Sequence, residues 1–100
     1  MRSIHEADLD SGRRVLVLTR ETVRPHLGTV TVAPITTEIR GLSTEVPLNS
    51  ANGIVTESVV SCDHITTIPV TALGNIVGYL LPAQEESLAV AVRAAFDLEC

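Results

Sequence analysis

The alternation of apolar and polar positions favours β-strands over most of this chain. Residues 29–32 read Thr-Val-Thr-Val, the two-residue period of a strand with one buried face and one polar face. Pro34 lacks an amide hydrogen and suits the end or the edge of a strand, so the half-buried strand is expected to finish there. A polar cluster follows it, namely Thr36, Thr37, Glu38 and Arg40. The mouth of this strand is therefore the expected place for binding groups.

The same reading predicts further strands at residues 4–9, 15–18, 42–48, 58–68 and 76–81. The continuous apolar run Val15–Leu18 indicates a strand that is covered on both faces. Residues 58–68 read as one long strand, in which odd-numbered and even-numbered side chains point to opposite faces. On that interpretation the neighbours Asp63 and His64 do not act on the same face.

Turn residues and one helical pattern fill the remaining segments. Residues 10–12 predict a tight turn, and residues 20–28 have turn and short-helix character around Pro25. Residues 49–53 form a turn cluster and are expected to be the most mobile loop. Pro82 suits the first position of a terminal helix, which carries an apolar stripe at helical spacing. The stripe consists of Leu88, Ala91, Val92, Ala95 and Phe96.

Length and composition narrow the class of protein. One hundred residues fit a single domain, residues 1–100, with one modest core. Apolar residues make up 45% of the chain and aromatic residues 2%, so the core must be aliphatic, which again favours strands. The longest apolar runs are too short for a membrane span, and the first residues lack a signal-peptide segment. A cytoplasmic protein without membrane contacts is expected.

The charges are unevenly distributed along the chain. The net charge is −5, yet residues 1–40 hold six arginines against five acids, and residues 41–100 hold one arginine against seven acids. All seven basic residues are arginines, whose planar fork suits bidentate contacts with phosphate. The sequence therefore favours a specific anion site over a diffuse basic surface.

Cysteine and histidine provide no evidence for a metal. Cys62 and Cys100 make neither a disulfide framework nor a metal motif, and they read as a core thiol and a tail thiol. His5, His26 and His64 also lack the spacing of metal ligands. No metal and no cofactor is expected.

Several stretches, in order along the chain, resemble the MazF/PemK (Kid) toxins of type II toxin–antitoxin systems, most closely the mycobacterial and actinobacterial members. The stretches are residues 13–18, 32–37, 45–48, 58–63, 67–68 and 76–80. The resemblance implies an SH3-like β-barrel of the CcdB/Kid/MazF type with a C-terminal helix, and a homodimer. It also implies a metal-independent endoribonuclease that cuts single-stranded RNA at short sequences, inhibits translation and growth, and is neutralised by a cognate MazE-like antitoxin.

The resemblance also implies roles for individual residues. The family's conserved arginine falls on Arg13, its catalytic Ser/Thr falls on Thr36, and a carboxylate that takes part in some relatives falls on Asp63. Two positions depart from the pattern: Arg14 stands where many members have proline, and Ser61 stands where the Kid branch has a second functional arginine. The loop between the first two strands is also very short. The acid–base scheme of the Kid branch therefore does not carry over intact.

Metal-free RNA cleavage requires proton removal from the 2′-hydroxyl, stabilisation of a dianionic phosphorane and protonation of the departing oxygen. Arg13 suits charge stabilisation, and Thr36 suits hydrogen-bond donation to the phosphate. Asp63 is the first choice for the base, with His64 or His26 as the alternative. The residues expected to contact RNA are Arg14, Thr37, Glu38, Arg40 and His64. Base reading is assigned to residues 38–43 and 49–57.

Two other functions fit the same residues. The barrel is also similar to toxins that poison DNA gyrase by protein contact without catalysis, and an acidic second half suits a protein partner. Alternatively, the Val15–Leu18 face serves assembly in a structural or regulatory subunit.

Overall fold

The computed structural model describes residues 2–9, 12–20 and 28–98. The turn expected at 10–12 lies largely outside these residues, as does most of 20–28, including Pro25 and His26. The strands are β1 (Ser3–Leu9), β2 (Gly12–Val17), β3 (Thr29–Thr36), β4 (Glu45–Leu48), β5 (Ser58–Ser61), β6 (Thr66–Pro69) and β7 (Ile76–Tyr79). Short 3-10 turns η2 (Ser50–Asn52), η3 (Cys62–His64) and η4 (Val70–Ala72) connect them, and α1 (Pro82–Ala95) follows.

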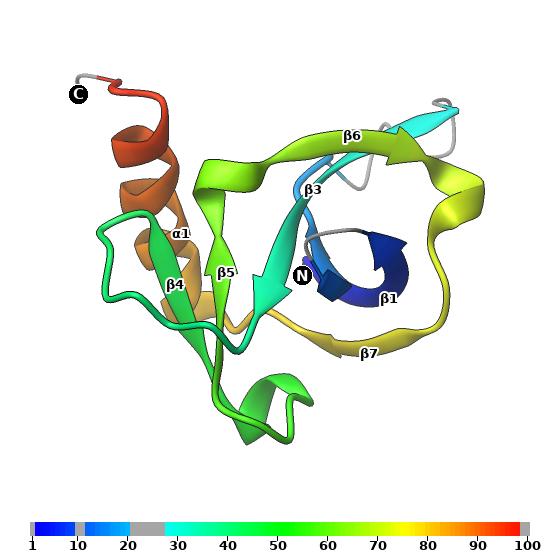
Figure 1. The fold of residues 1–100 in the computed structure, drawn as a ribbon, viewed down its shortest axis with the longest axis horizontal. Helices are drawn as coiled ribbons and strands as arrows, with labels where there is room; N and C mark the ends of the chain where they lie inside the picture. Colours follow the sequence, from blue (N-terminus) through cyan, green and yellow to red (C-terminus); the bar gives the residue numbers. More distant parts are fainter. Residues whose placement is uncertain (1, 10–11, 21–27, 99–100) are drawn as a thin grey trace.

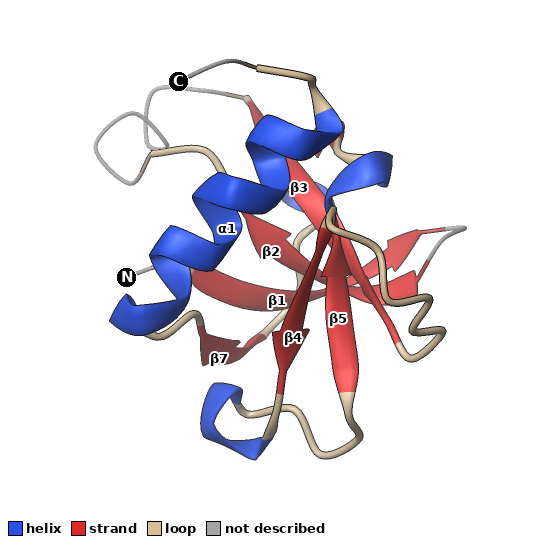
Figure 2. Cartoon of the chain, turned by 90° about the vertical axis from the view of Figure 1, so that its left-hand side faces the viewer, coloured by secondary structure: helices blue, strands red, loops and turns tan. Residues whose placement is uncertain are grey.

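The strands form one antiparallel sheet in the order β4-β5-β3-β2-β1-β7, with β6 added against β3. The sheet curls on itself, so that β6 and β7 lie on opposite sides of β1 (Figure 1). Helix α1 contacts β4 and η3 and lies across one side of the curled sheet (Figure 2). The prediction of a β-rich barrel-like fold with a C-terminal helix is confirmed.

Strand β3 is the centre of the sheet and is more deeply buried than its alternation predicts. Val30 and Val32 pack into one cluster of apolar residues, and Ala33 and Ile35 pack into the other, so the end of the strand is covered on both faces. The expectation of a polar face was wrong there, because the curl brings core to both sides. Pro34 does not end the strand either, since pairing continues to Thr36.

Residues 58–68 do not form one continuous strand. Both β5 and β6 pair antiparallel with β3, but the register changes between them. If the register of the pair Ile35↔Val60 continued, Asp63 would lie opposite Val32. Thr66 lies opposite Val32 instead. The η3 turn is therefore looped out of the strand. It leaves the sheet beside Ala33 and Pro34, which pair with neither β5 nor β6, and a proline is tolerated at such a gap.

Helix α1 covers the larger apolar cluster. Leu88 and Ala91 are buried against residues of several strands, and Val92 and Ala95 pack at the margin of that cluster. Phe96 was predicted to belong to the same stripe, but it lies past the helix and is 56% exposed. No helix in the described part of the chain has the length and apolar character needed to cross a bilayer.

Residues 49–53, expected as a mobile loop, form the hydrogen-bonded turn η2 instead. Asn49 caps the turn, and Asn52 has no exposed surface. The Asn52 amide donates to the carbonyl oxygen of Tyr79 at 2.9 Å and to Oε1 of Gln84 at 2.7 Å. The turn thus links β7 to the start of α1. The turn residues were recognised in the sequence, but their buried amide network was not.

Candidate active site

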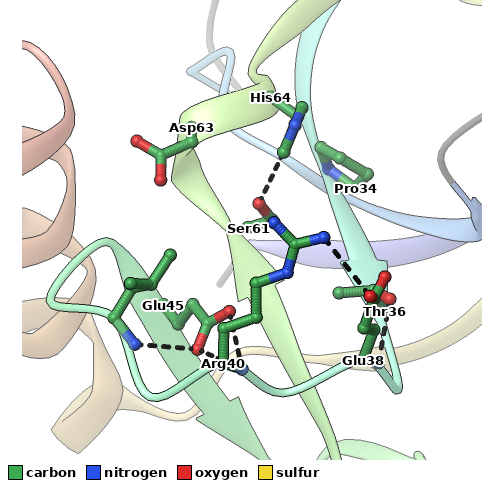
Figure 3. A pocket seen from close by; sticks show the side chains of 9 residues that line it. Pro34, Thr36, Glu38, Arg40, Glu45, Ser61, Asp63 and His64 are labelled. Atoms are coloured by element: carbon green, nitrogen blue, oxygen red, sulfur yellow. Dashed lines mark hydrogen bonds and ion pairs between the residues drawn. The ribbon is translucent and has the colours of Figure 1, made fainter.

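A polar hollow lies where β3, β5 and η3 meet the segment between β3 and β4 (Figure 3). It is lined by Pro34, Thr36, Glu38, Arg40, Leu42, Glu45, Ser61, Asp63 and His64. The predicted residues Thr36, Glu38, Arg40, Asp63 and His64 therefore come together in one place. Thr37 is exposed but does not line the hollow.

Thr36 stands at the last position of β3, and its hydroxyl is oriented by the chain that follows. The amide of Glu38 donates to Oγ1 of Thr36 at 3.0 Å. That contact uses the hydroxyl as an acceptor, so its hydrogen remains able to donate to a ligand. This is the arrangement expected of a group that binds an anionic oxygen.

The segment after β3 is held in shape by a single carboxylate. Oε1 of Glu45 accepts hydrogen bonds from the amides of Arg40, Gly41 and Leu42, at 3.2, 2.9 and 3.1 Å. Gly41 has a φ of 72°, a conformation that glycine adopts without strain. Glu45 therefore folds the segment so that Arg40 and Leu42 face the hollow.

Arg40 provides the positive charge at the mouth of the hollow. Its guanidinium reaches across towards Thr36 (Figure 3) and contacts the Glu38 carboxylate at 3.3 Å. Both side chains are mostly exposed, 61% for Arg40 and 73% for Glu38. Such an exposed ion pair is weak, so an incoming phosphate can compete for the guanidinium.

The two polar residues of η3 have different partners. The hydroxyl of Thr44 donates to Oδ2 of Asp63 at 2.6 Å, and the Asp63 carboxylate points away from the Arg40 guanidinium (Figure 3). Nδ1 of His64 lies 2.9 Å from Oγ of Ser61. Because η3 is looped out, both residues line the same hollow, and the prediction that they occupy opposite faces was wrong.

The two arginines of β2 line a second hollow together with Glu6 and Ala7. Strands β2 and β3 pair with Arg14 opposite Ile35, so the next position in the same register sets Arg13 opposite Thr36. Directly opposite residues of an antiparallel pair share a face, with Cβ atoms about 5 Å apart. The extended register therefore brings Arg13 next to Thr36 across the two strands, and Arg13 also lines the neighbouring hollow.

Cys62 shows that the turn has an apolar inner side. Its side chain is 1% exposed, which agrees with the predicted core thiol. Burial, assisted by the negative charge of Asp63, raises the pKa of the Cys62 thiol to about 11. The thiol is thus a neutral packing group and not a nucleophile.

Two polar residues of the hollow, Glu45 and Ser61, were not assigned a role from the sequence. Glu45 was read only as part of a strand, and Ser61 only as a departure from the Kid pattern. The adjacent pair Asp63 and His64, in the middle of the strand expected at residues 58–68, was the available sign of the looped-out turn. No group of three or more His, Cys, Asp or Glu side chains in the described residues is placed to hold a metal ion. Metal independence stays a prediction.

Residues 4–96 match the family model described as PemK-like, MazF-like toxin of type II toxin-antitoxin system. The chain belongs to this family. It is 62% identical over 99 residues to Endoribonuclease MazF3 of Mycobacterium tuberculosis, covering 99% of this chain and 96% of that protein. It is 38% identical to Probable endoribonuclease MazF5 of the same organism, covering 86% of this chain and 81% of the relative.

Solved structures show the same fold. The Mycobacterium tuberculosis toxin MazF-mt6 superimposes with a TM-score of 0.95 at 61% identity, covering 99% of this chain and all of that one. An endoribonuclease from a mycobacterial species, in complex with its cognate antitoxin, superimposes with a TM-score of 0.86 at 24% identity, covering 98% and 94% of the two chains. The second likeness concerns the fold alone. The suspected relation to MazF/PemK toxins is confirmed.

Proposed function

We propose that this chain, as an endoribonuclease toxin of the PemK and MazF family, cleaves single-stranded RNA by attack of a 2′-hydroxyl on the adjacent phosphate. The observation that carries the proposal is the Thr36 hydroxyl. It ends β3 with a hydrogen free to donate, at the edge of a polar hollow and opposite Arg13 in strand register. The cleavage requires no metal and leaves a 2′,3′-cyclic phosphate and a 5′-hydroxyl.

Each residue has a role that its chemistry allows. Thr36 donates a hydrogen bond to the scissile phosphate, and Arg13 turns towards Thr36 to stabilise the charge that develops on the phosphorane. Arg13 acts by its charge, because a guanidinium is a poor proton donor. Asp63 and His64 are the two groups of η3 that line the hollow and can accept the 2′-hydroxyl proton.

Binding of the RNA chain involves the rim of the site. Arg40 holds a phosphate next to the scissile one, and Arg14 holds another beyond Arg13. Thr37, Glu38 and His64 contact the sugar and base edges. The only tyrosine and phenylalanine of the chain do not make a stacking platform, so base reading depends on hydrogen bonds from loops.

The partners follow from the family and from the charge of the site. The toxin acts in the cytoplasm as a homodimer, with residues 1–100 as one toxin unit. A cognate MazE-like antitoxin neutralises it. In support, the mycobacterial endoribonuclease to which the fold is similar is in complex with its cognate antitoxin. An acidic, extended antitoxin segment competes with RNA phosphates for the arginines of the two hollows.

Incubation of the purified chain with a long RNA in the presence of a chelator tests the proposal. Mapping of the new ends is expected to show cuts at one short sequence, each leaving a 2′,3′-cyclic phosphate. The R13A and T36A variants are expected to lose the cuts. Growth arrest in cells with intact RNA would favour the gyrase-poison type of toxin instead, and the absence of both effects would favour a structural subunit.

A further inference from the structure

We infer that His64, oriented by Ser61, is the group that takes the proton from the 2′-hydroxyl, and that Asp63 holds the fold of the site instead. The inference depends on the proposed ribonuclease function and assigns one step of it. It rests on the different partners of two neighbouring side chains in η3.

The His64 ring has one nitrogen bound and one free. Nδ1 is 2.9 Å from Oγ of Ser61, a buried residue at the end of β5. Among the described residues, Nε2 of His64 has no hydrogen-bond partner, and the ring lines the hollow that also contains Thr36. When Nδ1 carries the hydrogen and donates to Ser61, Nε2 presents a lone pair to the hollow. Ser61 is thus a positioning residue that sets the ring orientation.

The Asp63 carboxylate is already engaged in the fold. It accepts the Thr44 hydroxyl at 2.6 Å, and the neighbouring amide of Cys62 donates to the Thr44 carbonyl oxygen at 3.0 Å. These two bonds fasten η3 to the start of β4. The carboxylate points away from the Arg40 guanidinium, where a phosphate would bind (Figure 3).

The charges around the His64 ring fit a proton acceptor. Arg40 from the segment after β3 faces the same hollow, as do the carboxylates of Glu38 and Glu45 and, from η3 itself, Asp63. The carboxylates stabilise the imidazolium that forms, and Arg40 stabilises the phosphate. Neither role requires Asp63 to move a proton.

The cleavage step moves one proton to His64 and exchanges one oxygen for another at phosphorus. The 2′-hydroxyl proton passes to Nε2 of His64 while the 2′-oxygen forms a bond to phosphorus. The bond from phosphorus to the 5′-oxygen breaks, and the departing oxygen takes a proton from water. The imidazolium then returns its proton to the solvent, so the enzyme is unchanged at the end of the reaction.

Single-turnover cleavage of a short RNA, containing the site that the wild-type chain cuts, tests the inference. The H64Q variant is expected to lose about 100-fold or more in rate, the usual contribution of a general base. The wild-type rate is expected to change with pH in a way that the residual H64Q rate does not share. The matched control H5Q removes an imidazole from β1, outside the hollow, and is expected to stay within about twofold of wild type.

Imidazole rescue and substitutions of Ser61 and Asp63 separate chemistry from structure. Added imidazole is expected to restore cleavage to H64A and to leave H5A unaffected. The S61A variant is expected to lose several-fold in rate, and S61T to regain most of it. D63N keeps an oxygen for Thr44 and is expected to lose far less than H64Q.

The possible outcomes test the role of His64 separately from the proposed ribonuclease function. A wild-type chain that cuts no RNA would refute the proposed function. A wild-type chain that cuts RNA, together with an H64Q variant that retains the wild-type rate and pH profile, would refute only the role of His64. A loss in D63N equal to that in H64Q, with no imidazole rescue of H64A, would assign the proton to Asp63.

Discussion

At the scale of the residue, the hollow contains side chains of two kinds. The carboxylates of Glu45 and Asp63 accept hydrogen bonds from the chain's own amides and hydroxyls, whereas Thr36, Arg40 and His64 keep donors or a lone pair for a ligand. The sequence predicted which residue types would gather here. It could not predict which carboxylates would be used by the fold, because that depends on the shape of the segment between β3 and β4.

The charge of Arg40 is expected to contribute to RNA binding through one phosphate contact. In R40A, the affinity for an RNA with a 2′-deoxy sugar at the cut site should fall by about threefold to tenfold. The slope of log affinity against log salt should flatten by about 0.7, the value for one phosphate on a single strand. R93A removes an exposed arginine of α1 and should change neither quantity. Equal losses in both variants would indicate diffuse charge attraction in place of a site.

The Cys62 thiol should make the stability of the protein sensitive to high pH. Burial raises its pKa from 9.0 to about 11, so above pH 9 the unfolded chain loses the thiol proton and the folded chain keeps it. The free energy of unfolding should therefore be unaffected by this group below pH 9 and fall by about 2 kcal/mol by pH 11. Urea denaturation of wild type and C62A across this range measures the difference. Parallel pH curves for the two proteins would contradict the burial argument.

At the scale of the element, the regular pieces were predictable and the interruption was not. Alternation located most strands and the proline located the start of α1, because local patterns fix local structure. The break between β5 and β6 arises because the two strands pair with different parts of β3 in different registers. Such pairing joins residues far apart in the sequence, so a local pattern does not predict it. That break is what brings Asp63 and His64 into one hollow.

The contact between η2 and β7 should tolerate no side chain at Gly78. A Cβ atom there would overlap the carbonyl oxygen of Asn52, whose own side chain is buried and bonded to Tyr79 and Gln84. G78A should lower the free energy of unfolding by about 2 kcal/mol or more. G28A meets no atom within 4 Å and should change stability by no more than about 0.5 kcal/mol. Urea denaturation compares the two, and a G78A protein as stable as G28A would show that the turn can move away.

At the scale of the whole molecule, the curl of the sheet determines the site. It buries both faces of β3 and lets the strand end in Thr36 at the rim of the hollow, opposite Arg13 of β2. The family resemblance predicted this fold, whereas composition alone predicted only an aliphatic, strand-rich domain. The positions of the guanidinium groups could not be predicted, because two adjacent arginines on one strand leave their final directions open.

A double-mutant cycle on Arg13 and Thr36 tests most directly whether these two side chains act on one phosphate. Single-turnover cleavage rates are measured for wild type, R13A, T36V and the double variant. The expectation is that each single change costs about 100-fold or more, and that the double variant is little slower than the worse single one, since residues acting as a unit are not additive. Fully additive losses, or a wild-type rate in either single variant, would contradict it.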